Sequence, residues 1–126
     1  MVVPEMIERK SGSIVIVSSI AGLRGTPILG AYGITKAADI QMTKNLAREY
    51  GPHNVRINSI APGLVRTDFA RGLWENPENL KASTSGAALG RIGEPREIAG
   101  AAVYLASDAS SFMTGQTIVI DGGVVV

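Results

Sequence analysis

The stretch SIAGLRGTPILGAYGITK, residues 19–36, decides how the rest of the chain is interpreted. It contains Tyr32 and Lys36 four positions apart, a spacing that places both side chains on one face of a helix. A lysine ammonium beside a phenol favours the ionised phenol, and the hydroxyl then becomes a usable proton donor and acceptor near neutral pH. The pair therefore predicts a site for proton transfer.

The segment that leads into this stretch predicts a strand. The run SIVIVSS, residues 13–19, is apolar without alternation, which indicates a parallel strand covered on both faces. Ser19 stands at the carboxyl end of that strand, where open α/β sheets bind their ligands. We therefore expect the Ser19 hydroxyl to meet Tyr32 and Lys36 across a crevice.

Strands and helices alternate along the rest of the chain. The expected elements are the end of a helix over 2–10, a helix over 31–50 stopped by Gly51 and Pro52, a strand over 55–61 ended by Pro62-Gly63, a helix from Pro95 to near residue 107, and a strand over 117–121. This order predicts the α/β class, with about three parallel strands and flanking helices.

Side-chain patterns predict which surfaces are covered. The long helix is apolar at Ile34, Ala37 and Ala38, which indicates cover by another element or subunit. The helix from Pro95 has a predicted core face, and the methionines are expected to fill gaps in the core. These predicted core residues are Ile98, Ala99, Ala102, Val103, Leu105 and Ala106, together with Met6, Met42 and Met113.

The apolar residues of the segment 66–90 follow no clear helix or strand period. This pattern predicts a long irregular segment, and such segments often form lids. Two interpretations of Trp74 stay open at this point. It packs a short helix onto the core, or it contacts a substrate.

Composition excludes several classes of function. The chain has 126 residues, which is one domain or less, and a formal net charge of +1, which gives no electrostatic footprint for nucleic acid or an anionic membrane. It has no cysteine and one histidine, His53, so we expect no metal site. No apolar run has the length of a membrane span and no signal peptide is evident, so the cytoplasm is the expected location.

Five stretches together resemble the short-chain dehydrogenase/reductase family. They are GSIVIVSS, AYGITKAA, NVRINSIAPGLVRT, RIGEPREIAGAAVYLAS and TGQTIVIDGG, in the family's order. A tyrosine and a lysine four apart recur by chance in helices. The serine thirteen residues before the tyrosine, the Pro-Gly after the next strand and the closing TGQ…DGG argue against chance.

This resemblance implies a catalytic set. Tyr32 is the expected acid/base that exchanges a proton with the substrate oxygen, and Lys36 is expected to bind the nicotinamide ribose. Ser19 is expected to hydrogen-bond the carbonyl or hydroxyl of a small-molecule substrate. Ser18 is the alternative, although the thirteen-residue spacing favours Ser19, and alternation along the strand end means that only one of the two faces the site.

The resemblance also implies coenzyme contacts after the second strand. The coenzyme is NAD or NADP. Pro62 and Gly63 form the turn that holds the nicotinamide, Val65 contacts the carboxamide through its backbone, and Thr67 points toward the carboxamide or phosphate. Family tetramers pair the long helix, so a homo-oligomer, a dimer or tetramer, is expected.

The sequence departs from the family in its nucleotide-binding part. No GxxxGxG or GxGxxG motif follows a strand, and the backbone N–H groups of such a turn hold the pyrophosphate. We therefore expect residues 1–126 to be a single partial domain, the C-terminal half of a Rossmann-like doubly wound sheet. The leading hypothesis is an oxidoreductase that interconverts a secondary alcohol and a carbonyl. The alternative is an inactive remnant that serves only in oligomerisation or complementation.

Overall fold

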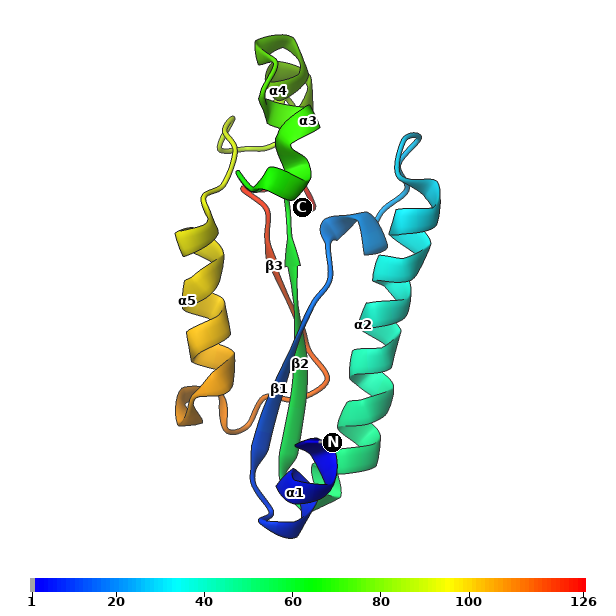
Figure 1. Cartoon of the computed structure of the whole chain (residues 1–126), viewed down its shortest axis with the longest axis vertical. Coiled ribbons are helices and arrows are strands. Elements are labelled where there is room, and N and C mark those ends of the chain that lie inside the picture. The colour runs from blue at the N-terminus through cyan, green and yellow to red at the C-terminus, as the bar shows by residue number, and fades with distance from the viewer. Residues whose placement is uncertain (1) are drawn as a thin grey trace.

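The computed structural model describes residues 2–126, in which a narrow parallel sheet lies between two long helices (Figure 1). In chain order the elements are α1 (Val2–Glu8), β1 (Gly12–Val17), η1 (Ile20–Gly22), α2 (Gly30–Tyr50), η2 (Gly51–His53), β2 (Val55–Pro62), η3 (Asp68–Ala70), α3 (Arg71–Trp74), α4 (Pro77–Thr84), α5 (Pro95–Ala106), η4 (Asp108–Ser110) and β3 (Thr117–Ile120). The α/β class with three strands and flanking helices is confirmed.

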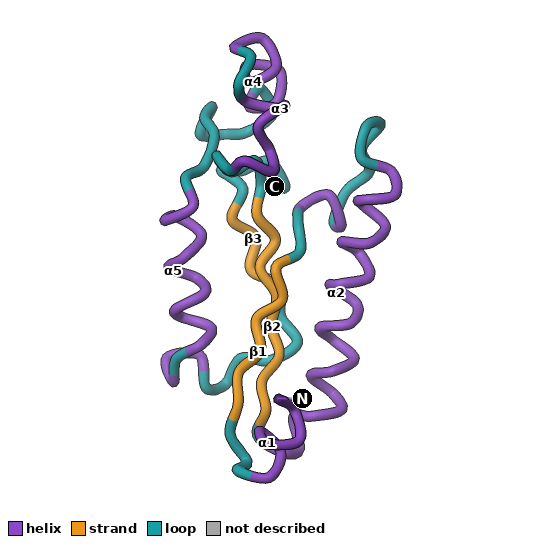
Figure 2. The backbone as a smooth tube through the Cα atoms, viewed as in Figure 1, coloured by secondary structure: helices purple, strands orange, loops and turns teal. Residues whose placement is uncertain are grey.

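All three strands run parallel in the order β1-β2-β3. Gly12 lies opposite Val55 at one end of the first pairing, and Ser59 lies opposite Thr117 in the second. The carboxyl ends of the strands therefore share one edge, where η1, α3, α4 and the first turns of α2 and α5 gather (Figures 1 and 2). This is the edge at which the sequence places the site.

The central strand β2 is covered on both faces. Val55, Ile57 and Ile60 are at most 1% exposed, and burial of each such side chain contributes about 1.5–3 kcal/mol. The buried amide of Asn58 donates to the Met113 carbonyl at 2.8 Å and accepts from the backbone N–H of Gln116 at 3.0 Å, so its polar atoms are satisfied. The unbroken apolar run over 13–19 predicts cover on both faces for β1 instead, but β1 is only partly buried and Val17 is 58% exposed.

Helix α2 buries Ile40, Thr43 and Ala47 against the sheet. Its predicted end at Tyr50 is confirmed, and Gly51 and Pro52 begin the separate short helix η2. The chain reverses at Asn54, which has φ 58°.

Helix α5 begins where Pro95 predicts, and a capping box between Glu94 and Glu97 closes its first turn. Leu105 is fully buried, but Val103 is 69% exposed, so its assignment to the core face is wrong. Met42 is likewise exposed rather than a core residue, whereas Met6 packs against the core cluster around Val55.

The prediction of an irregular segment over 66–90 is wrong for much of its length, which forms η3, α3 and α4. Asn76 begins α4 by accepting hydrogen bonds from the backbone N–H groups of Glu78 and Asn79, and Pro77 follows at the first helical position. These short helices stand beyond the carboxyl edge of the sheet (Figure 1).

Three predicted strand ends shift slightly, and β2 ends at Pro62 rather than Ala61. β1 ends at Val17 rather than Ser19, because the next residues turn into η1, and β3 ends at Ile120 rather than Asp121. No helix in residues 2–126 has the length and apolar character needed to cross a membrane.

Candidate active site

Tyr32 and Lys36 lie together in the first turns of α2. The Lys36 Nζ is 5.7 Å from the centre of the Tyr32 ring, on the shared helix face that their spacing predicts. This distance is within the range in which an ammonium is attracted by an aromatic ring. The two side chains therefore form one polar and aromatic unit at the carboxyl edge of the sheet.

Two acceptors from different elements hold the Lys36 ammonium. Its Nζ donates to the Val17 carbonyl at the end of β1, at 3.1 Å, and to the Asp39 Oδ2 on α2, also at 3.1 Å. An ammonium has three N–H groups and no acceptor. One N–H therefore remains for a ligand.

The two serines at the end of β1 have different environments. Ser18 is 4% exposed, and its Oγ donates to the Lys36 carbonyl at 2.7 Å. Ser19 is partly exposed, and its Oγ accepts from the Ala21 N–H at 3.1 Å. The Ser18 hydroxyl thus donates its hydrogen to the backbone of α2. The Ser19 hydroxyl acts as an acceptor in its hydrogen bond, so its own hydrogen can be donated to a ligand.

Two glycines let η1 press against the turn of α2 that contains Tyr32 and Lys36. A Cβ built on Gly22 would lie 2.5 Å from the backbone carbon of Lys36, and one on Gly33 would lie 2.9 Å from the Ala21 carbonyl oxygen. Since Ser19 precedes η1 directly, this packing brings Ser19 toward the Tyr32–Lys36 turn.

The Pro-Gly turn is built against the end of β3. Pro62 is paired with Ile120, the Gly63 N–H donates to the Ile120 carbonyl at 2.9 Å, and a Cβ on Gly63 would lie 2.8 Å from the Asp121 Cα. Gly63 is therefore required by close backbone packing, independently of any ligand.

Val65 forms an isolated parallel bridge with Gly93. The hydrogen bonds of this bridge run from the Arg66 N–H to the Gly93 carbonyl and from the Gly93 N–H to the Leu64 carbonyl. They leave the N–H of Val65 itself outside the bridge. The family resemblance implies a contact between the Val65 backbone and the coenzyme carboxamide, and this N–H has the direction of bonding that such a contact needs.

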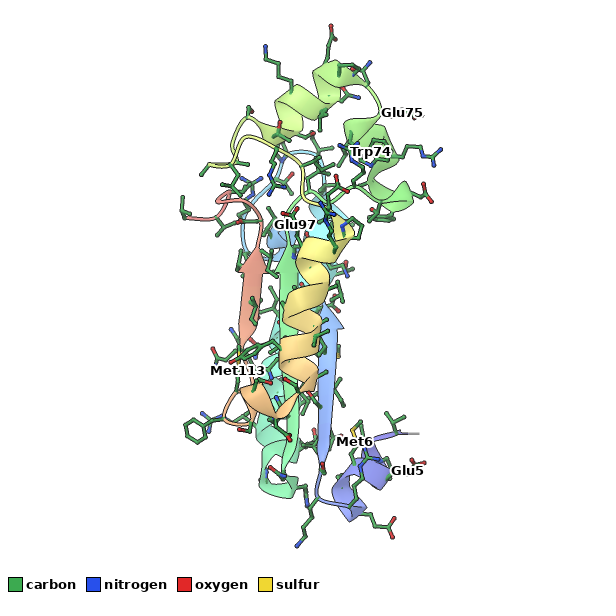
Figure 3. The ribbon with its side chains drawn as sticks, turned by 90° about the vertical axis from the view of Figure 1, so that its left-hand side faces the viewer. Glu5, Met6, Trp74, Glu75, Glu97 and Met113 are labelled. Atoms are coloured by element: carbon green, nitrogen blue, oxygen red, sulfur yellow. The ribbon has the colours of Figure 1, made fainter. Side chains whose placement is uncertain are left out.

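Thr67 is exposed, and its carbonyl accepts the Trp74 Nε1–H at 2.9 Å. The Arg66 guanidinium carbon lies 5.1 Å from the centre of the Trp74 ring. Trp74 therefore packs onto the loop that carries Thr67, beyond the carboxyl edge of the sheet (Figure 3). This contact with the loop differs from packing on the core, which is one of the two interpretations that the sequence leaves open for Trp74.

Sequence reasoning missed two residues at this site. The Phe69 ring lies 6.2 Å from the Tyr32 ring, centre to centre and tilted by 36°, and Phe69 is 85% exposed. Asp39 holds the Lys36 ammonium. Its position three residues after Lys36 was the available signal, whereas the approach of Phe69 to Tyr32 depends on the tertiary fold.

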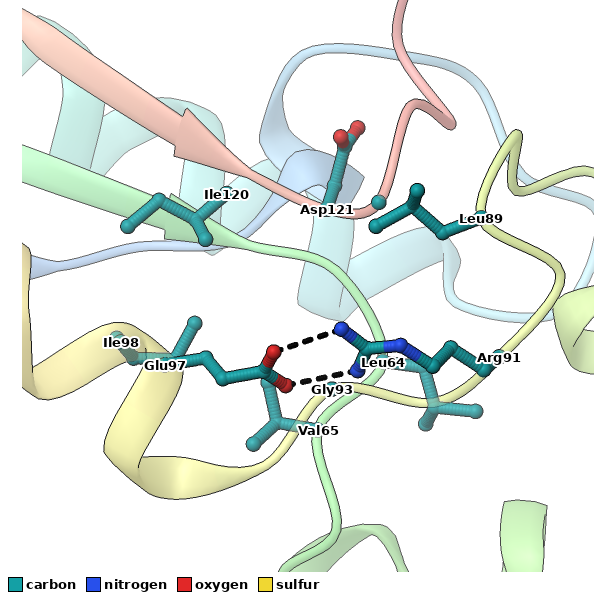
Figure 4. A pocket seen from close by; sticks show the side chains of 10 residues that line it. Leu64, Val65, Leu89, Arg91, Gly93, Glu97, Ile98, Ile120 and Asp121 are labelled. Atoms are coloured by element: carbon teal, nitrogen blue, oxygen red, sulfur yellow. Dashed lines mark hydrogen bonds and ion pairs between the residues drawn. The ribbon is translucent and has the colours of Figure 1, made fainter.

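A small pocket beside Val65 is lined in part by an ion pair. Arg91 on its wall makes two hydrogen bonds to the Glu97 carboxylate, at 2.9 and 2.7 Å (Figure 4). The hydrogen bond from Arg91, aided by the backbone N–H of Glu94, lowers the pKa of Glu97 from 4.5 to about 2. This ion pair ties the end of the 66–92 segment to the first turn of α5.

The site has donors in three places that suit the nicotinamide half of a dinucleotide. They are the remaining Lys36 N–H, the Ser19 hydroxyl and the Val65 N–H, and a ribose, a carbonyl and a carboxamide all offer oxygen acceptors. The residues present therefore fit that half. Within residues 2–126 there is no cluster of three metal-ligating His, Cys, Asp or Glu side chains.

Known proteins resemble the chain over nearly its full length. A family model described as enoyl-(acyl carrier protein) reductase matches residues 1–125. The chain is 49% identical to dehydrogenase/reductase SDR family member 4 of Bos taurus and 48% identical to 3-oxoacyl-[acyl-carrier-protein] reductase FabG of Chlamydia muridarum, with 97% of the chain aligned in each case. It covers 44% and 48% of those two proteins, and thus spans about half the length of the curated relatives it matches.

Solved structures agree with the sequence relatives. A 4-hydroxyisoleucine dehydrogenase mutant complexed with NADH and succinate aligns with a TM-score of 0.93 and 38% identity, over 98% of this chain and 51% of that protein. The motif order, the parallel sheet and these matches lead to the same assignment. The chain belongs to the short-chain dehydrogenase/reductase family.

Proposed function

We propose that this chain provides the catalytic half of an NAD(P)-dependent oxidoreductase that interconverts a secondary alcohol and a carbonyl. The observation that supports this proposal most is the Lys36 ammonium, held by Val17 and Asp39 beside the Tyr32 ring with one N–H to spare. A fixed cation next to a phenol suits proton transfer to and from a substrate oxygen.

The proposed roles follow from the hydrogen-bonding capacity of each residue. The bound coenzyme supplies or accepts the hydride. In the reduction direction, the Tyr32 hydroxyl gives its proton to the substrate oxygen, and the Ser19 hydroxyl donates a hydrogen bond to the same oxygen. Lys36 binds a ribose hydroxyl and stabilises the phenolate that Tyr32 becomes. In the oxidation direction, Tyr32 accepts the proton.

The coenzyme proposal rests on fewer contacts than a whole dinucleotide site provides. Lys36, the Pro62-Gly63 turn, the Val65 N–H and Thr67 serve the nicotinamide half, and we propose that the glycine-rich turn for the pyrophosphate is missing from this chain. A solved relative is described as complexed with NADH, and either NAD or NADP is compatible with the contacts proposed here. Residues 1–126 would then be one partial domain of a longer fold.

The substrate proposal is a small molecule with a carbonyl or secondary hydroxyl group. One relative is named as a 3-oxoacyl reductase and another as a hydroxyisoleucine dehydrogenase, and these names share only the carbonyl–alcohol pair. We therefore propose this reaction class without a particular substrate, in a homo-oligomer.

Tyr32→Phe tests this function because it removes only the hydroxyl. With NADH or NADPH and a panel of 3-oxoacyl thioesters and simple ketones, we expect kcat/KM to fall at least about 10²-fold, the usual size of a general acid–base contribution. The thermal midpoint is expected to stay unchanged, and Tyr104→Phe, a change on α5, serves as the matched control. Full activity of Tyr32→Phe would overturn the mechanism. Turnover that Tyr32→Phe abolishes would exclude the alternative, a non-catalytic oligomerisation or complementation module.

A further inference from the structure

The Lys36–Asp39 ion pair has features that helix stability does not explain. A basic residue that precedes its acidic partner is the weaker orientation for an intrahelical pair, since the helix dipole favours acids toward the N-terminus. Lys36 and Asp39 nevertheless form this pair in the front half of α2. The gain in helix stability is therefore a poor reason for a carboxylate at this position.

The pair is also better sheltered than the others. Its side chains are 23% and 27% exposed, the lowest values among the four ion pairs of residues 2–126. By contrast, Arg71 and Asp68, which have the same spacing of three, form a pair that is mostly exposed. Shelter from water strengthens an ion pair and narrows the positions that its long side chain can adopt.

The acceptors of the ammonium come from two directions. The Val17 carbonyl belongs to the end of β1, and the Asp39 carboxylate belongs to α2. A lysine side chain has four rotatable bonds and loses considerable entropy when it is fixed. One acceptor alone leaves the ammonium free to swing about that contact, whereas two acceptors on separate elements determine where its third N–H points.

We propose that Asp39 is a positioning residue for Lys36, which it holds beside Tyr32 so that one N–H remains directed at a ribose hydroxyl. The ribose hydroxyl as the target of this N–H rests on the proposed function. Asp39 touches neither substrate nor coenzyme in this account. Its removal should therefore loosen the ammonium and leave the fold of α2 intact.

The test observes the Lys36 ammonium directly, by ¹⁵N–¹H correlation spectroscopy of the lysine Nζ groups in the full chain. Ammonium hydrogens held by hydrogen bonds exchange slowly enough with water to be detected at low temperature, and Lys36→Arg identifies the signal. We expect a Lys36 signal in the unmodified chain. In Asp39→Asn the ammonium hydrogens should exchange with water about two- to fivefold faster, which is the change expected from losing one partly exposed ion pair.

Three comparisons make this result specific. Asp39→Glu restores a carboxylate and is expected to recover most of the slow exchange. Glu49→Gln, which removes an exposed carboxylate elsewhere on α2, is expected to leave the Lys36 signal unchanged. Circular dichroism checks that every variant is folded.

A Lys36 signal that is absent from the unmodified chain, or equally slow in Asp39→Asn, would overturn the proposal. This readout needs neither coenzyme nor substrate, so it stands whether or not turnover is detected. Where turnover is measured, Asp39→Asn is expected to raise the KM for coenzyme several-fold and to change kcat less, because the Tyr32 hydroxyl is intact.

Discussion

Ser18 and Ser19 are adjacent and chemically identical, yet the structure gives them separate tasks. Ser18 is buried and joins the end of β1 to α2 through the Lys36 carbonyl, whereas the Ser19 Oγ accepts the Ala21 N–H and caps η1. The thirteen-residue spacing favours Ser19 as the ligand contact, which stays a prediction, and the hydrogen bond of Ser18 to the Lys36 carbonyl is compatible with it.

Ser18→Ala is expected to lower the free energy of unfolding by about 1 kcal/mol, the typical net value of one hydrogen bond. Ser19→Ala should cost less, since water can reach the Ala21 N–H in its partly exposed position. Urea denaturation of both variants measures the difference. A larger loss in Ser19→Ala would contradict the division of tasks between the two serines.

Gly22 is the point at which η1 touches the backbone of α2. A Cβ there would lie 2.5 Å from the Lys36 backbone carbon, so Gly22→Ala forces the two elements apart and is expected to cost about 1–3 kcal/mol. Gly25→Ala is the control, because a Cβ at that position meets nothing within 4 Å. Thermal unfolding compares the two variants, and equal midpoints would show that η1 does not depend on this close approach.

At the scale of the element, the first turn of α5 depends on an ion pair with Arg91. Because the pKa of Glu97 in the folded chain is lowered to about 2 from 4.5, its carboxylate stabilises the fold above pH 4.5, and this contribution is lost as the pH falls toward 2.

Glu97→Gln therefore should lower the thermal midpoint at pH 7, and the difference from the unmodified chain should shrink as the pH falls from 4.5 toward 2. Scanning calorimetry over this range measures it, with Glu75→Gln, an exposed residue after α3, as the control. A difference that stays constant over the same pH range would mean that the ion pair contributes nothing to stability.

The strands and long helices could be predicted because their signals are local. The apolar run over 13–19 indicates a strand, which forms as β1, and Pro95 marks the start of α5. The signal for α4 was also local, in Asn76 and Pro77, but the weak periodicity of 66–90 obscured it. The end of β1 is predicted two residues too late, since the strand stops where the chain turns into η1 with Ser19 as its cap.

The candidate site divides in the same way. Tyr32 and Lys36 share a helix face, so their sequence spacing fixes their approach. Phe69 contacts Tyr32 from a segment 37 residues further along the chain, and no local sequence pattern predicts that contact. Sequence thus predicts the pairs within one element better than the pairs between elements.

For the whole molecule, large apolar side chains on the outside predict self-association. Ile34 on α2 is 73% exposed and Val103 on α5 is 69% exposed, while Ala37 and Ala38 extend the apolar face of α2. Exposed faces of this kind are typical of interaction surfaces.

Sedimentation at low micromolar concentration is expected to show a dimer or larger species, and Ile34→Glu should shift the chain toward monomer. Ile28→Glu is the control, since Ile28 is 81% exposed but precedes α2. A well-folded monomer with a cooperative thermal transition in the unmodified chain would contradict this expectation.

We propose that Tyr32, Lys36 and the turn after β2 together hold the nicotinamide half of a coenzyme. Reduced nicotinamide mononucleotide carries that half alone, so its titration into ¹⁵N-labelled chain tests the claim without any contribution from a pyrophosphate site. We predict amide shifts clustered at Ser19, Tyr32, Lys36 and residues 63–67, which weaken in Lys36→Ala, and none of these shifts with adenosine monophosphate. The absence of shifts at millimolar ligand, or shifts confined to residues away from the carboxyl edge of the sheet, would contradict the account.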